Sequence, residues 1–100
     1  MSLYSQFVKA VGDVAAQADY TYRNIAAVLE TAGLGPENLI KTIEYVTPEG
    51  LADYRSVGGV RKELLAEPWP ASTGALCHSL LRPEFMIEID PLAMYPRDSA

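Results

Sequence analysis

The sequence has a single cysteine and no long apolar run. One thiol permits no disulfide within the chain. No stretch approaches the ~20 consecutive apolar residues that a membrane-spanning helix needs. Residues 1–10 also lack the basic-then-apolar pattern of a secretory signal peptide. We therefore expect a cytoplasmic protein with no membrane partner.

Cationic side chains are scarce as well, with 8 Lys and Arg against 13 Asp and Glu. The resulting net charge of −5 opposes a phosphate backbone, and the cations are scattered rather than gathered in one stripe. Nucleic acid is therefore not an expected partner. The composition that remains, 49% hydrophobic and 21% charged, is ordinary for a globular protein. A chain of 100 residues suits one domain, which we expect to span residues 1–100.

Helical spacing begins after Asp13, where apolar residues recur every three or four positions. Asp13 suits the N-cap of this helix, and Gly33 suits its end. The expected buried stripe consists of Val14, Ala18, Tyr22, Ile25, Leu29 and Ala32. Residues 2–10, which alternate loosely, are interpreted as a short strand or an extended arm.

Residues 39–46, LIKTIEYV, are rich in β-branched and aromatic side chains and predict a strand. Their apolar residues fall on both faces, with Leu39, Ile43 and Tyr45 on one and Ile40 and Val46 on the other, which indicates a central strand covered on both sides. Thr47-Pro48-Glu49 then predicts the start of a second helix that runs to about Ala66. Its expected stripe is Leu51, Tyr54, Val57, Val60 and Leu64, weakened at Gly58-Gly59.

Residues 71–94 predict two strands joined directly by a tight turn at Arg82-Pro83. In that hairpin Cys77 would lie opposite Glu88, on a polar face, and the second face would form core. The polar face would carry Thr73, Ala75, Cys77, Ser79, Met86, Glu88 and Asp90, and the core face Gly74, Leu76, His78, Leu80, Phe85, Ile87 and Ile89. Two helices can cover only one face of such a sheet, so we expect an oligomer that covers the other.

Several short motifs resemble one known family when they are taken in order. They are the helix end from Asn24 to Gly33, the strand start from Asn38 to Thr42, and the pairing of PAST at 70–73 with IEID at 87–90. Over residues 12–94 the chain resembles the YjgF/Rid family, the reactive-intermediate deaminases. The resemblance implies an α+β fold of the chorismate-mutase-like type, with a mixed sheet and two helices on one face. It also implies a homotrimer with small-molecule clefts between adjacent subunits.

The resemblance implies a site as well. In the deaminase branch of the family, an arginine clamps a substrate carboxylate and a glutamate on the last strand handles water during hydrolysis of an enamine or imine. Glu88 matches that glutamate and is the expected catalytic residue. The arginine's position falls on Thr73 when it is counted back from Glu88, and on Ser72 when it is counted forward from Pro70, and neither residue is basic.

The expected substrate-binding residues are Ser72, Thr73, Cys77 and Tyr4. Tyr4 resembles a tyrosine that often borders the family's cleft, although the middle of the usual N-terminal entry is missing before Gly12. Cys77 is expected to line the pocket rather than to act as a nucleophile, because no histidine shares its face. The alternative for Glu88 is a solvated outer position.

No metal or other cofactor is expected. His78, Cys77 and Asp90 diverge along their strands and are too few for a usual metal site. Two functions stay open. One is an enamine or imine deaminase, or a related hydrolase, with an altered cleft between subunits. The other is a non-catalytic member that binds a metabolite or partner in the same cleft.

Overall fold

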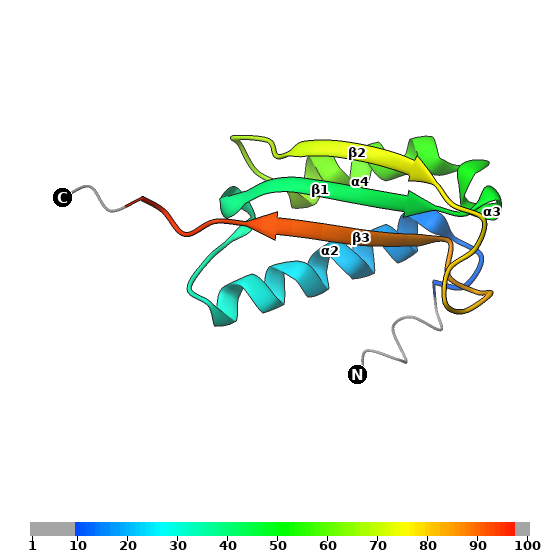
Figure 1. Ribbon diagram of the computed structural model, residues 1–100, viewed down its shortest axis with the longest axis horizontal. Coiled ribbons are helices and arrows are strands. Elements are labelled where there is room, and N and C mark those ends of the chain that lie inside the picture. The colour runs from blue at the N-terminus through cyan, green and yellow to red at the C-terminus, as the bar shows by residue number, and fades with distance from the viewer. Residues whose placement is uncertain (1–9, 98–100) are drawn as a thin grey trace.

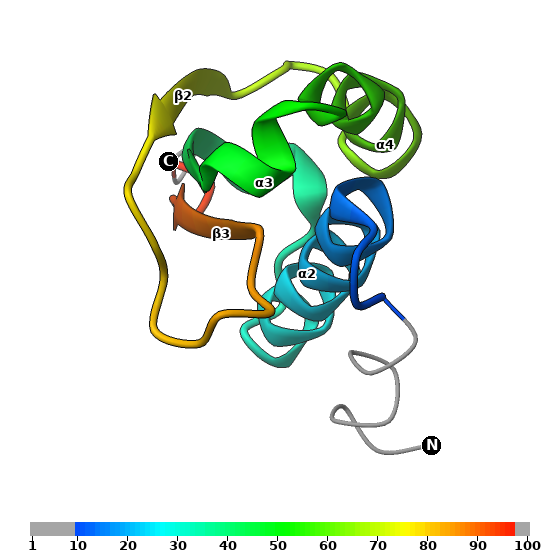
Figure 2. The ribbon, with the colours of Figure 1, turned by 90° about the vertical axis from the view of Figure 1, so that its right-hand side faces the viewer.

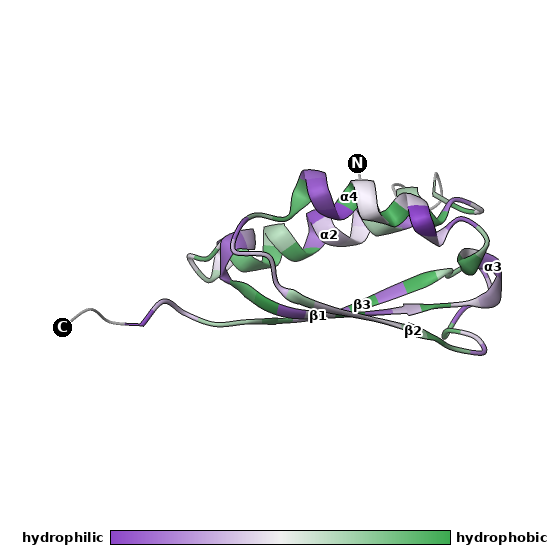
Figure 3. Cartoon of the chain, turned by 90° about the horizontal axis from the view of Figure 1, so that it is seen from above, coloured by the Kyte–Doolittle hydropathy of each residue, from purple (hydrophilic) through white to green (hydrophobic). Residues whose placement is uncertain are grey.

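The computed structural model describes residues 10–97, which form one three-stranded sheet with helices packed on a single face (Figure 3). The main elements in chain order are α2 (Val14–Thr31), β1 (Leu39–Val46), α3 (Pro48–Leu51), α4 (Val57–Leu64), β2 (Ala71–Leu76) and β3 (Ile87–Ala93) (Figure 1). Two 3-10 turns, η1 (Pro36–Asn38) and η2 (Tyr54–Ser56), lie before β1 and before α4. The α+β class with helices on one face is therefore confirmed. No helix within residues 10–97 is both long and apolar enough to span a bilayer.

The helix α2 begins and ends where the sequence predicts. The Asp13 side chain accepts a hydrogen bond from the backbone N–H of Ala16 at 3.0 Å and caps the first turn. Gly33 ends the helix with a φ of +74°, a conformation that glycine adopts without steric cost. The buried side of α2 carries Val14, Ala18, Tyr22 and Leu29. Ala32 is exposed, so the predicted stripe is one residue too long.

The second helical segment begins as predicted but does not run unbroken to Ala66. Thr47 caps α3 by accepting a hydrogen bond from the backbone N–H of Gly50, but α3 stops at Leu51, which is half exposed. The chain turns at Asp53, whose backbone leaves the helical conformation, and η2 and α4 follow. The turn places Tyr54 against the sheet, where its hydroxyl bonds to Glu44.

The hairpin predicted for residues 71–94 is wrong. The strand order is β2-β1-β3, with β2 parallel and β3 antiparallel to β1. Residues 77–86 form a loop that carries the chain from one edge of the sheet to the other (Figure 2). Cys77 therefore does not lie opposite Glu88, because its backbone N–H donates to Val46 O at 2.9 Å, while Glu88 pairs with Tyr45. Residues 39–46 form the central strand as predicted, but the described helices cover only one of its two faces.

The alternation on β3 follows the prediction, whereas that on β2 and just beyond it does not, because Leu76 and His78 were predicted to be core and are exposed. Ile87 and Ile89 are buried against the helices, while Glu88 and Asp90 are exposed. On β1, however, a register shift between Leu39 and Lys41 interrupts the alternation. Leu39 is consequently buried in the core, although its predicted position was on the face of Ile43 and Tyr45.

A fully buried carboxylate, that of Glu44, lies in the middle of β1 on the helix side of the sheet. Tyr22 of α2 donates a short hydrogen bond to its Oε2. Tyr54 of η2 and Arg61 of α4 donate to its Oε1 at 2.6 and 2.5 Å. One side chain of the central strand thus binds all three segments that cover the sheet.

Gly74 makes room for this cluster. It lies on β2 directly beside Glu44, and a Cβ built there would come within 2.8 Å of the Tyr54 hydroxyl. Gly50 allows another close approach, because a Cβ there would lie 2.8 Å from the backbone oxygen of Met86 and 3.2 Å from Val46 Cγ1.

Two glycine substitutions test this packing in opposite directions. Gly50→Ala should lower the free energy of unfolding by about 1–3 kcal/mol, because backbone cannot yield to the new methyl group. Gly59→Ala, at a helical site with no heavy atom within 4 Å, should raise it by about 0.5–1 kcal/mol. Urea denaturation followed by circular dichroism measures both. Equal effects of the two substitutions would contradict the close contact at Gly50.

The Glu44 cluster is tested by Glu44→Gln, which keeps the shape and removes the charge. The expected loss is about 2 kcal/mol of unfolding free energy, because hydrogen bonds to a charged acceptor contribute about 1.5–3 kcal/mol each and an amide has one accepting oxygen. The matched control is Glu63→Gln on α4, whose carboxylate is exposed, and it should leave the denaturation midpoint unchanged. A Glu44→Gln protein as stable as the wild type would show that the cluster contributes no net stability.

Candidate functional site

The candidate site lies on the face of the sheet that no described helix covers (Figure 3). The register of β1 with its two neighbours brings strand residues together on this open face. They are Lys41, Ile43 and Tyr45 of β1, Ala71, Thr73 and Ala75 of β2, and Glu88, Asp90 and Leu92 of β3. Below, "open face" means these nine residues.

Glu88 is exposed on the open face, next to Tyr45 of the central strand. The predicted neighbours Cys77 and Ala75 do not flank it directly, because β1 lies between β2 and β3. Adjacent strands are about 4.8 Å apart, so β2 lies about 10 Å from β3. Tyr45 of β1, which pairs with both Glu88 and Ala75, lies in that interval on the same face.

Thr73 and Ser72, the two candidates for the arginine's position, face opposite sides of the sheet. Thr73 lies on the open face, at the level of Ile43 and Asp90. Ser72 lies on the helix side, where its Oγ accepts a hydrogen bond from Thr42 Oγ1 at 3.3 Å. Only Thr73 therefore shares a face with Glu88, and the two hydroxyls do not form one binding group.

Cys77 follows the end of β2 and is half buried. Its Sγ lies 3.6 Å from the backbone oxygen of Val46, as a weak donor would. Tyr4, the remaining predicted binding residue, lies outside the described residues. The substrate-binding roles of Cys77, Tyr4, Ser72 and Thr73 stay predictions.

A hollow of about 210 Å³ lies on the open face, lined by Lys41, Ile43, Asp90, Pro91 and Leu92. Lys41 and Asp90, which carry opposite charges, thus line the same hollow. Lys41 had no predicted role. Its alternation with Ile43 and Tyr45 was the signal that could have placed it on the same face as Glu88.

The Glu44 cluster was also missed, and it is the most strongly perturbed group of ionisable side chains among residues 10–97. Burial, together with the hydrogen bond and the charge of Glu44, raises the pKa of Tyr22 far above its usual range. The same causes raise the pKa of Tyr54. Burial opposes the charge of Arg61, but its hydrogen bond and ion pair with Glu44 raise its pKa. The signal in the sequence was a glutamate inside a strand rich in β-branched and aromatic residues, two positions from Val46.

This cluster positions side chains and does not itself present a reactive group. Both Glu44 oxygens are occupied by donors, and within residues 10–97 no buried side-chain nitrogen or oxygen lacks a hydrogen-bond partner. The guanidinium of Arg61 is the member that extends toward the surface, because its side chain is 30% exposed while that of Glu44 is 0% exposed. No three His, Cys, Asp or Glu side chains converge as metal ligands anywhere in residues 10–97.

The comparisons with known proteins agree with this architecture. The family model described as endoribonuclease L-PSP matches residues 4–95. The RutC family protein slr0709 of Synechocystis sp. is 28% identical over 85 residues, which are 85% of this chain and 64% of that protein. The chain therefore spans slightly less than two thirds of that relative's length.

Two solved structures share the fold. Rv2704 of Mycobacterium tuberculosis, described as a member of the YjgF/YER057c/UK114 family, is 28% identical with a TM-score of 0.76, over 83% of this chain and 69% of that one. PA3499 of Pseudomonas aeruginosa, described as a protein of unknown function, is 37% identical with a TM-score of 0.75, over 81% and 57%. The chain belongs to the YjgF/Rid family, the family whose model carries the description endoribonuclease L-PSP.

Proposed function

We propose that this protein binds a small enamine-like or imine-like molecule on the open face of its sheet, between the subunits of a homotrimer, and that Glu88 handles water for its hydrolysis. The observation that carries the proposal is the exposed Glu88 on a sheet face that no described helix covers. Half-buried Tyr45 lies beside it, and half-buried Ile43 and Ala75 lie farther across the same face. A second subunit on this face would exclude bulk water from the carboxylate.

The proposed chemistry needs one water molecule and one carboxylate. Glu88 accepts a proton from water while the oxygen attacks the carbon of the C=N bond. The protonated Glu88 then gives this proton to the nitrogen, which completes a carbinolamine. Glu88 next takes the hydroxyl proton and passes it to the amine, so that the C=O bond forms as the C–N bond breaks, releasing ammonia and leaving a ketone. An enamine enters the same route after a proton moves to its carbon and converts it to the imine.

Orientation of a carboxylate substrate is the weak step in this scheme. Thr73 offers one neutral hydrogen bond where the resemblance implies a bidentate, charge-assisted arginine. Lys41 is the one cation among the nine residues of the open face. It lies four residues along β1 from Tyr45, the partner of Glu88, which corresponds to about 13 Å along the strand. An ammonium at that distance attracts an anion but does not fix its plane.

The weak orientation of a carboxylate favours a second function. In this function the protein binds a metabolite in the same cleft but does not catalyse its reaction. The absence of a guanidinium from the open face is its support. RNA cleavage, which the family's description names, is not proposed. Glu88 and Asp90 on the open face, together with a net charge of −5, would repel a phosphate backbone.

We expect Glu88→Gln to abolish any release of ammonia from freshly generated 2-iminobutyrate while leaving the fold intact. The amide keeps the shape of the side chain but cannot accept the proton from water. Ammonia is measured by a coupled assay, and Glu63→Gln on the exposed side of α4 is the control. Turnover by the wild type that is lost only in Glu88→Gln supports the hydrolase.

The remaining outcomes separate the two functions. No turnover by the wild type, with metabolite binding that Glu88→Gln weakens, supports the binding protein. Turnover or binding that Glu88→Gln leaves unchanged removes Glu88 from the site.

We also expect a trimer in solution, with a mass of about 33 kDa, three times the 10.9 kDa of one chain. Leu92→Lys should dissociate it, because Leu92 is an exposed apolar residue of the open face and a second subunit would bury the charge. Val28→Lys, at a similarly exposed position on α2, should leave the mass unchanged. Light scattering at micromolar concentration measures all three proteins. A wild-type monomer would refute the trimer.

A further inference from the structure

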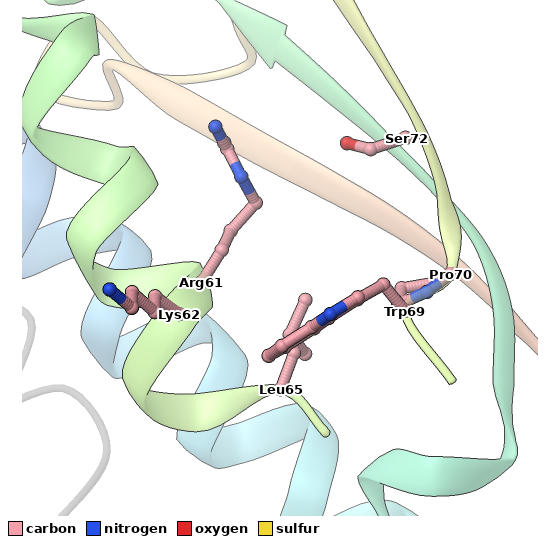
Figure 4. Close-up of a pocket in the computed structure, with 6 residues that line it drawn as sticks. All are labelled: Arg61, Lys62, Leu65, Trp69, Pro70 and Ser72. Carbon is pink, nitrogen blue, oxygen red and sulfur yellow. The ribbon is translucent and has the colours of Figure 1, made fainter. Parts of the chain in front are cut away.

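A second cavity lies on the helix side of the sheet, between α4, the loop before β2 and β2 itself (Figure 4). Its volume is about 340 Å³, and it is lined by Arg61, Lys62, Leu65, Trp69, Pro70 and Ser72. Ser72 and Thr73 are neighbours on β2 that face opposite sides. This cavity is therefore separated from the open face by the sheet, and an inference about it does not rest on the proposed function.

One end of the cavity is polar and held in place. Glu44, fully buried behind it, fixes the Arg61 guanidinium through Nη1 at 2.5 Å. A guanidinium carries five N–H donors, so this bond leaves others for a ligand. Figure 4 shows the Ser72 hydroxyl on the side of the cavity toward Arg61. Ser72 accepts from Thr42 Oγ1, and its own O–H can donate.

The other end of the cavity is apolar and aromatic. The indole of Trp69 and the side chain of Leu65 both line it, together with Pro70, the residue before β2 (Figure 4). Leu65 is buried, whereas Trp69 is 53% exposed. An indole so exposed offers a face on which a planar ring can stack.

The charge around the cavity favours an anion. Lys62 lies on the rim, and Figure 4 shows its ammonium directed away from the cavity, so it contributes charge rather than a contact. Arg61 shares its charge with Glu44, which limits the attraction but leaves its donors oriented. The volume is at the small end of the range for ligand pockets, about 300–1,000 Å³, and suits a molecule with one ring.

We propose that this cavity binds a small aromatic monocarboxylate. The carboxylate accepts hydrogen bonds from the Arg61 guanidinium and the Ser72 hydroxyl, and the ring packs against Trp69 and Leu65. Arg61 and Trp69 thus select charge and planarity, while the volume of the recess suits a single ring. Glu44 is a positioning residue that holds the guanidinium for the ligand.

The chain carries a single tryptophan, Trp69, so its fluorescence reports on this cavity alone. The experiment titrates the full chain with phenylacetate and with its uncharged isostere phenylacetamide, exciting the indole selectively. Phenylacetate should give a saturable change, and the apparent affinity for phenylacetamide should be at least tenfold weaker. The absence of a saturable change, or an equal response to both compounds, would overturn the proposal.

Variants of β2 locate the binding. Ser72→Phe fills the cavity and should abolish the response, whereas Ala71→Phe, the adjacent residue on the open face, should leave it unchanged. Ser72→Ala removes only the hydroxyl and should weaken binding roughly tenfold, so a poorly folded Ser72→Phe protein does not end the test. A response that survives both Ser72 variants would overturn the proposal.

A further variant separates this cavity from the open face. Glu88→Gln should leave the phenylacetate response unchanged, because the sheet lies between Glu88 and Trp69. A response lost in Glu88→Gln would place the ligand on the open face and refute the cavity. A failure of the ammonia assay has no bearing on this result, since the two measurements concern opposite faces.

Discussion

The buried carboxylate of Glu44 is the constraint on which the rest of the structure depends. A buried charge is costly unless it is paired and hydrogen-bonded, and Glu44 receives one donor from each of α2, η2 and α4. The three segments must therefore keep fixed positions over the central strand. The requirement also explains two local irregularities. The helical segment breaks after Leu51 so that Tyr54 reaches Glu44, and β2 carries Gly74 where a side chain would displace the Tyr54 hydroxyl.

The two faces of the sheet differ in how they are covered. Every donor to Glu44 comes from the helix side, and no described helix covers the other face. The helix side is closed by a polar cluster within an apolar core. The open face keeps Ile43 and Tyr45 half buried and leaves Leu92 exposed. Apolar surface of this kind, next to exposed carboxylates, suits an interface with a second subunit better than free solvent. The same division places Arg61 on one face and Glu88 on the other, so no single small ligand can contact both.

The sequence predicted the features that depend on neighbouring residues and missed those that depend on distant ones. The ends of α2, the central position of β1 and the outward direction of Glu88 all follow from local spacing and capping. The pairing of β2 with β3 was wrong because alternation determines which face a residue takes but not which strand lies beside it. In the structure each backbone edge of residues 39–46 is paired, one with β2 and the other with β3, so these two strands cannot pair with each other. The Glu44 cluster brings together Tyr22, Tyr54 and Arg61, which are far apart in the sequence, so no local pattern predicts it.

At the position of the family's arginine, a shift of one residue along β2 changes the face of the sheet on which the side chain lies. Counting from either end of the motif led to Ser72 or Thr73, and adjacent strand residues face opposite sides. Only Thr73 shares the face of Glu88, so it is the residue that stands where a clamp for the proposed substrate would be needed. A hydroxyl there, with Lys41 as the only cation among the nine residues of the open face, leaves a carboxylate attracted but poorly oriented. Ser72 faces the cavity of Arg61 instead, where a guanidinium is held in place by Glu44. The described chain thus has its preorganised anion-binding group on the helix side of the sheet and its exposed carboxylates on the other.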